Sequence, residues 1–151
     1  VLLHKSSGKG MWVVDLDTVM PGCILHDFGD LVRTAACSAM EDEVALEKVY
    51  FLPETFAAIV RGYLESAGSI LEQKEIDHLP VAPLVITYEL GLRFLSDHIN
   101  GDQYFKIKRP NHNLDRVRAQ FKLLTSMEGN LGNIRSIVAE HTKLLNSTAS
   151  P

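Results

Sequence analysis

The order of secondary structure is decided by residues 11–22, MWVVDLDTVMPG, where strand-like sequence gives way to helical sequence. The first part of this stretch is rich in apolar and β-branched residues, which favour an extended strand. Pro21 cannot donate a ladder hydrogen bond and Gly22 favours a turn, so we expect the strand to end before them. On its N-terminal side, the turn-forming segment 5–10 follows the short apolar run 1–4. The two runs together predict a β-hairpin.

After this stretch the apolar residues recur at the spacing of an α-helix. The period predicts about five helices, over about residues 27–36, 53–67, 81–99, 113–127 and 131–145. We expect Asp27 to cap the first helix, Pro53 to begin the second, and Gly68 to close the second in the left-handed conformation. The stripe expected on the third helix is Leu84, Tyr88, Leu92 and Leu95. The predicted fold class is therefore α+β and mostly α, with an N-terminal β-hairpin and about five helices.

The length of 151 residues is typical of one structural unit. We expect that unit to span residues 1–146, with a disordered tail over residues 147–151. A two-stranded sheet is marginal by itself, and the chain begins at Val1 instead of at a methionine. These features predict the helical end of a larger α+β protein.

Composition argues against several classes of protein. The chain has 15 Lys and Arg against 19 Asp and Glu, a formal net charge of −4, which argues against a general nucleic-acid binder. No apolar run approaches the roughly 20 residues that a membrane helix requires. Cys23 and Cys37 are too few for a disulfide framework. We therefore expect a cytoplasmic protein in which both thiols are reduced.

Asp15 and Asp17 are the residues most indicative of chemistry. At a spacing of i and i+2 on a strand, two side chains project to the same face. Two carboxylates at the end of a buried strand need compensation for lost hydration, and Mg²⁺ supplies it because hard cations prefer carboxylate oxygens. The alternative is that both acids lie at a solvated strand end and pair with Arg or Lys.

Two enzyme mechanisms fit this pair of acids. In a kinase-like lobe, Asp15 would hold the Mg²⁺ that bridges the phosphates of ATP. In a haloacid-dehalogenase-type phosphatase, Asp15 would be the nucleophile, Asp17 the general acid, and residues 84–87 (LVIT) the second motif. Such a phosphatase also needs a late strand ending in paired acids, for which residues 76–78 are the nearest approach. A third alternative is a non-catalytic helical module that binds a partner protein.

Two motifs, residues 14–22 (VDLDTVMPG) and 27–33 (DFGDLVR), closely resemble those of the aminoglycoside-phosphotransferase-like sugar kinases. Within that family the N-acetylhexosamine 1-kinase branch is the most similar. Further matches are residues 89–95 (ELGLRFL), 102–105 (DQYF) and 112–123 (HNLDRVRAQFKL). The resemblance spans roughly residues 1–128. Members of this branch are sometimes named mucin-desulfating sulfatases, but neither cysteine here has the (Cys/Ser)-x-Pro-x-Arg context that a sulfatase needs.

The resemblance implies the C-terminal lobe of an ATP-dependent kinase that phosphorylates a sugar, at the anomeric hydroxyl of an N-acetylhexosamine. Asp15 matches the second metal-binding acid and Asp17 the acid that follows it, so both are candidate Mg²⁺ ligands. Arg93 and Tyr104 would contact the sugar. The catalytic aspartate, the first metal ligand and the ATP-binding lobe should precede Val1, so we expect no catalytic residue in this chain and no activity from it alone. The expected partners are the sugar, ATP and that missing lobe, without nucleic acid or membrane. The surface that the lobe would cover predicts self-association.

The residues themselves leave alternatives open for Arg93 and Tyr104. An arginine on an otherwise apolar helical stripe needs a partner, and a planar donor fork suits a sugar. The alternative for Arg93 is an internal ion pair with Asp27, Asp30 or Glu89. For Tyr104 the alternative is simple packing between helices.

Three charged segments complete the candidates. Residues 27–29 (DFG) resemble a protein-kinase metal motif, but they directly precede helical sequence, so we interpret them as a helix start. The acidic run 41–43 predicts a solvated approach to a helix. The basic run 106–109 predicts either attraction of a phosphate or simple solubility.

Overall fold

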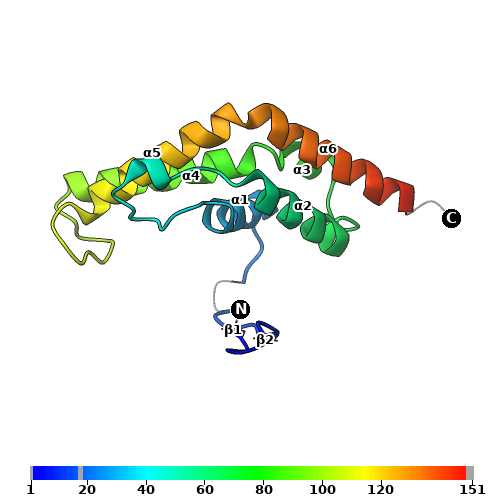
Figure 1. Cartoon of the computed structure of the whole chain (residues 1–151), viewed down its shortest axis with the longest axis horizontal. Helices are drawn as coiled ribbons and strands as arrows, with labels where there is room; N and C mark the ends of the chain where they lie inside the picture. Colours follow the sequence, from blue (N-terminus) through cyan, green and yellow to red (C-terminus); the bar gives the residue numbers. More distant parts are fainter. Residues whose placement is uncertain (1, 17–18, 149–151) are drawn as a thin grey trace.

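The computed structural model describes residues 2–16 and 19–148 and is mostly helical (Figure 1). A short antiparallel hairpin of β1 (Leu2–Leu3) and β2 (Gly10–Trp12) precedes helix α1 (Ile24–Ala35). A 3₁₀ turn, η1 (Leu46–Lys48), leads to α2 (Pro53–Ala67) and the short α3 (Gln73–His78). Three long helices follow, α4 (Ala82–Ile99), α5 (His112–Gly129) and α6 (Leu131–Thr148). The predicted fold class, α+β and mostly α, is confirmed.

The hairpin is shorter than the sequence predicts. Its strands pair only over Leu2–Leu3 and Gly10–Trp12, and residues 13–16 are not a strand. Asp15 has a φ of 66°, which belongs to the left-handed region and not to an extended strand. Residues 2–16 are all exposed. Figure 1 shows the hairpin set apart from the helices.

Helix α1 packs closely on α4 because Gly29 has no side chain. A Cβ at Gly29 would lie 2.8 Å from the backbone oxygen of Ala82 and 2.7 Å from Cγ1 of Ile86. A second close approach occurs between α4 and α5, where a Cβ at Gly91 would lie 2.9 Å from the ring of Phe121. These two glycines set the distances between the three helices that surround the candidate site.

The hydrophobic core lies between α1, α2, α5 and α6. Phe28, Phe56 and Val60 are fully buried, and the ring of Phe28 contacts those of Phe56 and Tyr63. Core residues from α5 and α6 are Leu123, Met127, Ile134 and Val138. The apolar residues that recur at the helical period along α2, namely Phe56, Ile59, Val60, Tyr63 and Leu64, therefore face the core.

The stripe predicted for α4 is wrong for two of its four residues, although Leu84 packs against the core and Leu95 is half-buried. Tyr88 and Leu92 are exposed, whereas Thr87 is fully buried and Gly91 is buried. Close packing explains the reversal, because the face of α4 that meets α1 and α5 must carry small side chains. Val85, Tyr88 and Leu92 are left on the outer face, whereas Phe94 is buried.

The ends of three helices also differ from the prediction. Helix α1 begins after the N-cap Cys23, so Asp27 lies in its first turn and does not cap it. Gly68 follows α2 with a φ of −57°, a right-handed conformation instead of the expected left-handed one. Helix α6 continues to Thr148, into the segment for which we expected no order; residues 149–151 lie outside the described residues.

Helix α3 is absent from the prediction. A capping box stabilises it, in which the side chains of Glu72 and Glu75 accept hydrogen bonds from each other's backbone N–H groups. Residues 76–78 lie in this helix, so they do not form the late strand that a phosphatase would need. Within residues 2–16 and 19–148, no helix has the length and hydropathy required to span a membrane.

Candidate functional site

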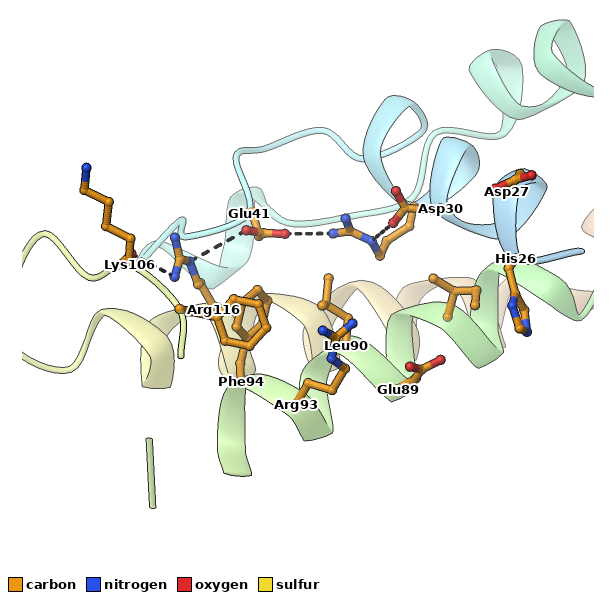
Figure 2. Close-up of a pocket in the computed structure, with 13 residues that line it drawn as sticks. His26, Asp27, Asp30, Glu41, Glu89, Leu90, Arg93, Phe94, Lys106 and Arg116 are labelled. Atoms are coloured by element: carbon orange, nitrogen blue, oxygen red, sulfur yellow. Dashed lines mark hydrogen bonds and ion pairs between the residues drawn. The ribbon is translucent and has the colours of Figure 1, made fainter. Parts of the chain in front are cut away.

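A cavity of about 570 Å³ lies where α1, α4 and α5 meet two loops, residues 36–45 and 100–111 (Figure 2). This volume is within the range of small-molecule sites, about 300–1,000 Å³. Phe94 and Phe105 supply aromatic surface, and most of the other lining residues are charged. The charged or titratable residues are His26, Asp27, Asp30, Arg33, Glu41, Glu89, Arg93, Lys106 and Arg116.

Acidic side chains gather at the end of the cavity formed by the start of α1. Asp27 and Asp30 come from α1, and Glu89 lies on α4 (Figure 2). Asp30 accepts a hydrogen bond from Nε of Arg33 at 2.8 Å. Asp27 and Glu89 form no ion pair within the described part of the chain. Their exposed carboxylates remain available as hydrogen-bond acceptors.

Arg93 occupies the middle of the cavity wall on α4. Its guanidinium carbon lies 6.0 Å from the centre of the Tyr104 ring and 5.5 Å from the centre of the Phe105 ring. None of the ion pairs considered for it from the sequence is formed between described residues. Because Arg93 is exposed, its planar N–H groups are free to bind a ligand.

Tyr104 lies beside Arg93 and is not packed between helices. It is 75% exposed, and its ring meets that of Phe105 edge-on at 4.8 Å. Phe105 in turn contacts Phe94 at 4.6 Å. We call Arg93, Tyr104 and Phe105 the aromatic wall. Arg93 and Phe105 face both the main cavity and an adjoining hollow of about 380 Å³, which Tyr104 also lines.

Asp97 anchors the loop that carries Tyr104 and Phe105. Its Oδ1 accepts hydrogen bonds from the backbone N–H groups of Gln103 at 3.0 Å and Tyr104 at 2.8 Å. Its Oδ2 accepts from the N–H of Phe105 at 3.0 Å and from Nδ2 of Asn113 at 2.8 Å. Burial, with 7% of Asp97 exposed, raises its pKa. The four hydrogen bonds outweigh that effect, so the net pKa of Asp97 is lowered.

Glu41 bridges two arginines at the other side of the cavity. Its Oε1 accepts a hydrogen bond at 3.0 Å from Nη1 of Arg33, which is only 8% exposed. Its Oε2 lies 3.6 Å from Nε of Arg116, whose guanidinium lies over the ring of Phe94 at 5.1 Å. The prediction of a solvated acidic run is therefore wrong for Glu41. Sequence reasoning missed this bridge because Arg116 comes from a distant helix.

Asp42 fixes the end of the loop that leads into α5. It accepts hydrogen bonds from Nη1 of Arg109 at 3.0 Å and from Nε2 of His112 at 2.9 Å. The bond from Arg109 lowers the pKa of Asp42, burial opposes it, and the bond from His112 adds to the net lowering. The basic run 106–109 is thus divided, because Arg109 is held by Asp42 whereas Lys106 lines the cavity.

The structure does not bring Asp15, the first of the two predicted metal-binding acids, to the cavity. Asp15 is exposed in the segment before α1 and does not line the cavity, and Asp17 lies outside the described residues. Because residues 13–16 are not a strand, Asp15 does not lie on the strand face that the sequence predicts for it. Across residues 2–16 and 19–148, no group of three or more His, Cys, Asp or Glu is placed to hold a metal ion. The described donors therefore do not by themselves fit a complete Mg²⁺ site.

No protein-family model matches the chain.

Proposed function

We propose that this chain is the helical lobe of an ATP-dependent phosphotransferase that phosphorylates a sugar, at the anomeric hydroxyl of an N-acetylhexosamine. The observation that carries the proposal is the free guanidinium of Arg93 beside the rings of Tyr104 and Phe105, in the wall of a polar cavity. The resemblance of residues 14–33 to sugar kinases supplies the reaction class, and the chemistry of the cavity supports a carbohydrate as the substrate.

The aromatic wall suits both kinds of surface that a sugar presents. The C–H groups on the face of a pyranose pack against aromatic rings, whereas its hydroxyl and acetamido oxygens accept hydrogen bonds from a planar guanidinium. At the end of the cavity beside the start of α1, the carboxylates of Asp27 and Glu89 are acceptors for hydroxyl groups. A donor in the middle of the cavity and acceptors at one end would orient a monosaccharide in one direction.

The balance of charge supports a neutral substrate. Four carboxylates and four Arg or Lys side chains line the cavity. Arg33 is already neutralised by Asp30 and Glu41 at 2.8 and 3.0 Å. A strongly anionic sugar would need an excess of cations, which the lining does not provide.

The contribution of this lobe to the reaction would be binding and orientation. Asp15 would supply one Mg²⁺ ligand, and bound Mg²⁺ would neutralise charge that develops on the transferred phosphoryl group. Arg93 and the acidic end of the cavity would hold the sugar so that one hydroxyl faces the nucleotide. Such orientation converts an encounter of two substrates into an effectively unimolecular step.

Sugar binding can be measured on this chain by isothermal titration with N-acetylglucosamine. Arg93→Gln removes the charged donor fork from the wall, and we expect it to weaken binding at least about tenfold, because a hydrogen bond from a charged group contributes about 1.5–3 kcal/mol. Arg135→Gln is the matched control, since Arg135 is exposed on α6 and does not line the cavity. Equal affinities for all three proteins would contradict the proposal.

A test of phosphoryl transfer requires a longer protein in which this chain would be joined to an ATP-binding lobe. Phosphorus NMR would follow two samples, one with ATP, Mg²⁺ and N-acetylhexosamines, the other with N-acetylhexosamine 1-phosphates and no ATP. A sugar 1-phosphate formed in the first sample supports the kinase. Free phosphate released only in the second would favour the phosphatase, with Asp15 as its nucleophile. No feature of residues 2–16 and 19–148 favours the phosphatase or the non-catalytic module, so the kinase is our single proposal.

A further inference from the structure

The carboxylate of Asp97 is fully occupied by the loop behind the aromatic wall. A carboxylate offers about four lone-pair sites, and Asp97 fills them with three successive backbone N–H groups, those of residues 103–105, and with the amide of Asn113. Asp97 forms no ion pair among the described residues, and it lines the adjoining hollow but not the main cavity. Because these four donors occupy its lone pairs, its carboxylate is committed to the loop and not to a substrate.

The chain bends at residues 101–102, so that the N–H groups of residues 103–105 reach Asp97. Gly101 and Asp102 both have positive φ angles, 88° and 56°, and the N–H of Asp102 donates to the backbone oxygen of Asp97 at 2.8 Å. Nδ2 of Asn113 joins the two aspartates, because it donates to Asp97 at 2.8 Å and to Asp102 at 2.9 Å. A left-handed conformation at a residue other than glycine persists where its surroundings over-determine it. Here the side chains of Asp97 on α4 and Asn113 on α5 impose the shape of the loop.

The position of this backbone fixes where the rings of the wall begin. Tyr104 is 75% exposed, and its ring lies against Phe105 and Arg93. The backbone sets the Cα from which the Tyr104 ring extends, and these two contacts orient the ring. The Tyr104 and Phe105 N–H groups both bind Asp97, so one carboxylate sets the position of both rings relative to Arg93.

We infer that Asp97 is a positioning residue for sugar recognition, which fixes Tyr104 and Phe105 beside Arg93 before the sugar arrives. The inference rests on the proposed function, since the wall recognises a sugar only if the chain binds one. A preformed wall spares the loop from being ordered at the moment of binding, and that ordering would otherwise weaken the affinity. Loss of Asp97 should therefore appear as weaker sugar binding in a chain that is still folded.

Asp97→Asn tests this role because an amide cannot replace the carboxylate in either orientation. One pair of donors, the N–H groups of Gln103 and Tyr104, faces Oδ1, and the other pair, from Phe105 and Asn113, faces Oδ2. Whichever way the substituted amide turns, its NH₂ group meets two donors. We expect the dissociation constant for N-acetylglucosamine to rise about tenfold, a typical result when a positioned group is released.

A control variant separates positioning from general stability. Val60→Ala opens the core at a fully buried residue of α2 that does not line the cavity. We expect Val60→Ala to lower the denaturation midpoint and to leave the affinity for N-acetylglucosamine unchanged. Weakened binding by Val60→Ala to the same degree as by Asp97→Asn would show that lost stability alone explains the effect, which would overturn the inference.

Amide hydrogen exchange on the unmutated chain provides a measurement that does not depend on the variant. If Asp97 preorganises the loop, the N–H groups of residues 103–105 are protected without sugar, and N-acetylglucosamine adds little protection. Protection that appears only with sugar would overturn the inference while leaving the proposed function intact, and so would an Asp97→Asn chain that binds normally. If the unmutated chain binds no sugar, the proposed function and the inference both fail, even where the three amides are protected.

Discussion

Replacement of Gly29 by alanine should destabilise the chain, although alanine is the better helix former. Gly29 lies within α1, where it is buried against α4. An added Cβ would lie 2.8 Å from the backbone oxygen of Ala82 and 2.7 Å from Cγ1 of Ile86. The Ile86 side chain can rotate away, but the backbone of Ala82 cannot, so α1 must move outward by several tenths of an ångström.

The size of the effect follows from two opposing contributions. Alanine in place of glycine in a helix contributes about 1 kcal/mol of stability, and overpacking against a rigid neighbour costs about 1–3 kcal/mol. We expect a net loss of about 1 kcal/mol for Gly29→Ala. Gly62→Ala is the matched control, because Gly62 lies inside α2 and a Cβ there would meet no atom within 4 Å. This control should gain about 0.5–1 kcal/mol.

Urea denaturation of the two variants measures this difference directly. The midpoints should move in opposite directions from that of the unmutated chain, with unchanged slopes, and their free energies of unfolding should differ by about 2 kcal/mol. An increase in stability for Gly29→Ala that matches the increase for Gly62→Ala would show that α1 does not lie as close to α4 as the structure indicates.

Three further predictions concern charged and polar residues. The pKa values of Asp42 and Asp97 are lowered on folding, so the stability that they contribute is present above the unfolded value of 3.8 and is lost as the pH falls through their folded values. Urea midpoints measured from about pH 5 to about pH 3 should decrease, and less steeply in Asp42→Asn; a parallel decrease would refute the contribution of Asp42. In the longer protein that we propose to be a kinase, Asp15→Asn should abolish phosphoryl transfer with an unchanged circular dichroism spectrum, whereas near-normal turnover would exclude a metal-binding role. Gln120→Leu removes an acceptor 3.3 Å from Nη1 of Arg33, and it should cost about 1 kcal/mol in chemical denaturation because the two carboxylate partners of that arginine remain.

The helices that the sequence predicts well are those whose signals are local. Helix α2 begins at Pro53, which fits the first turn of a helix, and its apolar residues recur at one period that faces the core. Helix α3 escapes prediction because it has only six residues and depends on a capping box more than on a long apolar period. The strand ends at Trp12 although β-branched residues follow, because strand propensity takes effect only where a paired strand lies opposite.

The candidate site is less accessible to sequence reasoning, since its geometry depends on contacts between distant segments. The sequence pattern and the resemblance to a kinase family both draw attention to Arg93, whereas Tyr104 is a candidate through the resemblance alone. That these two side chains lie side by side is visible only in the structure. Glu41 and Asp97 carry no local signal. Glu41 resembles any acidic loop residue until Arg33 and Arg116 approach it, and a helical aspartate such as Asp97 looks solvated until a loop folds over it.

One face of α5 joins these separate contacts into a single support for the cavity. Asn113, Arg116 and Gln120 are spaced by three and four residues, so they lie on the same side of the helix. Asn113 holds the Asp97 carboxylate and accepts a hydrogen bond from Nη1 of Arg116 at 2.8 Å, while Gln120 accepts one from Arg33. This face is polar yet largely buried, and Asn113 and Gln120 are 0% and 3% exposed. Buried polar groups are costly unless each is hydrogen-bonded, so the cost of this stripe is offset by the partners that it holds in place around the cavity. The apolar residues of α5 build the core, and its polar stripe determines where the charges of the site lie.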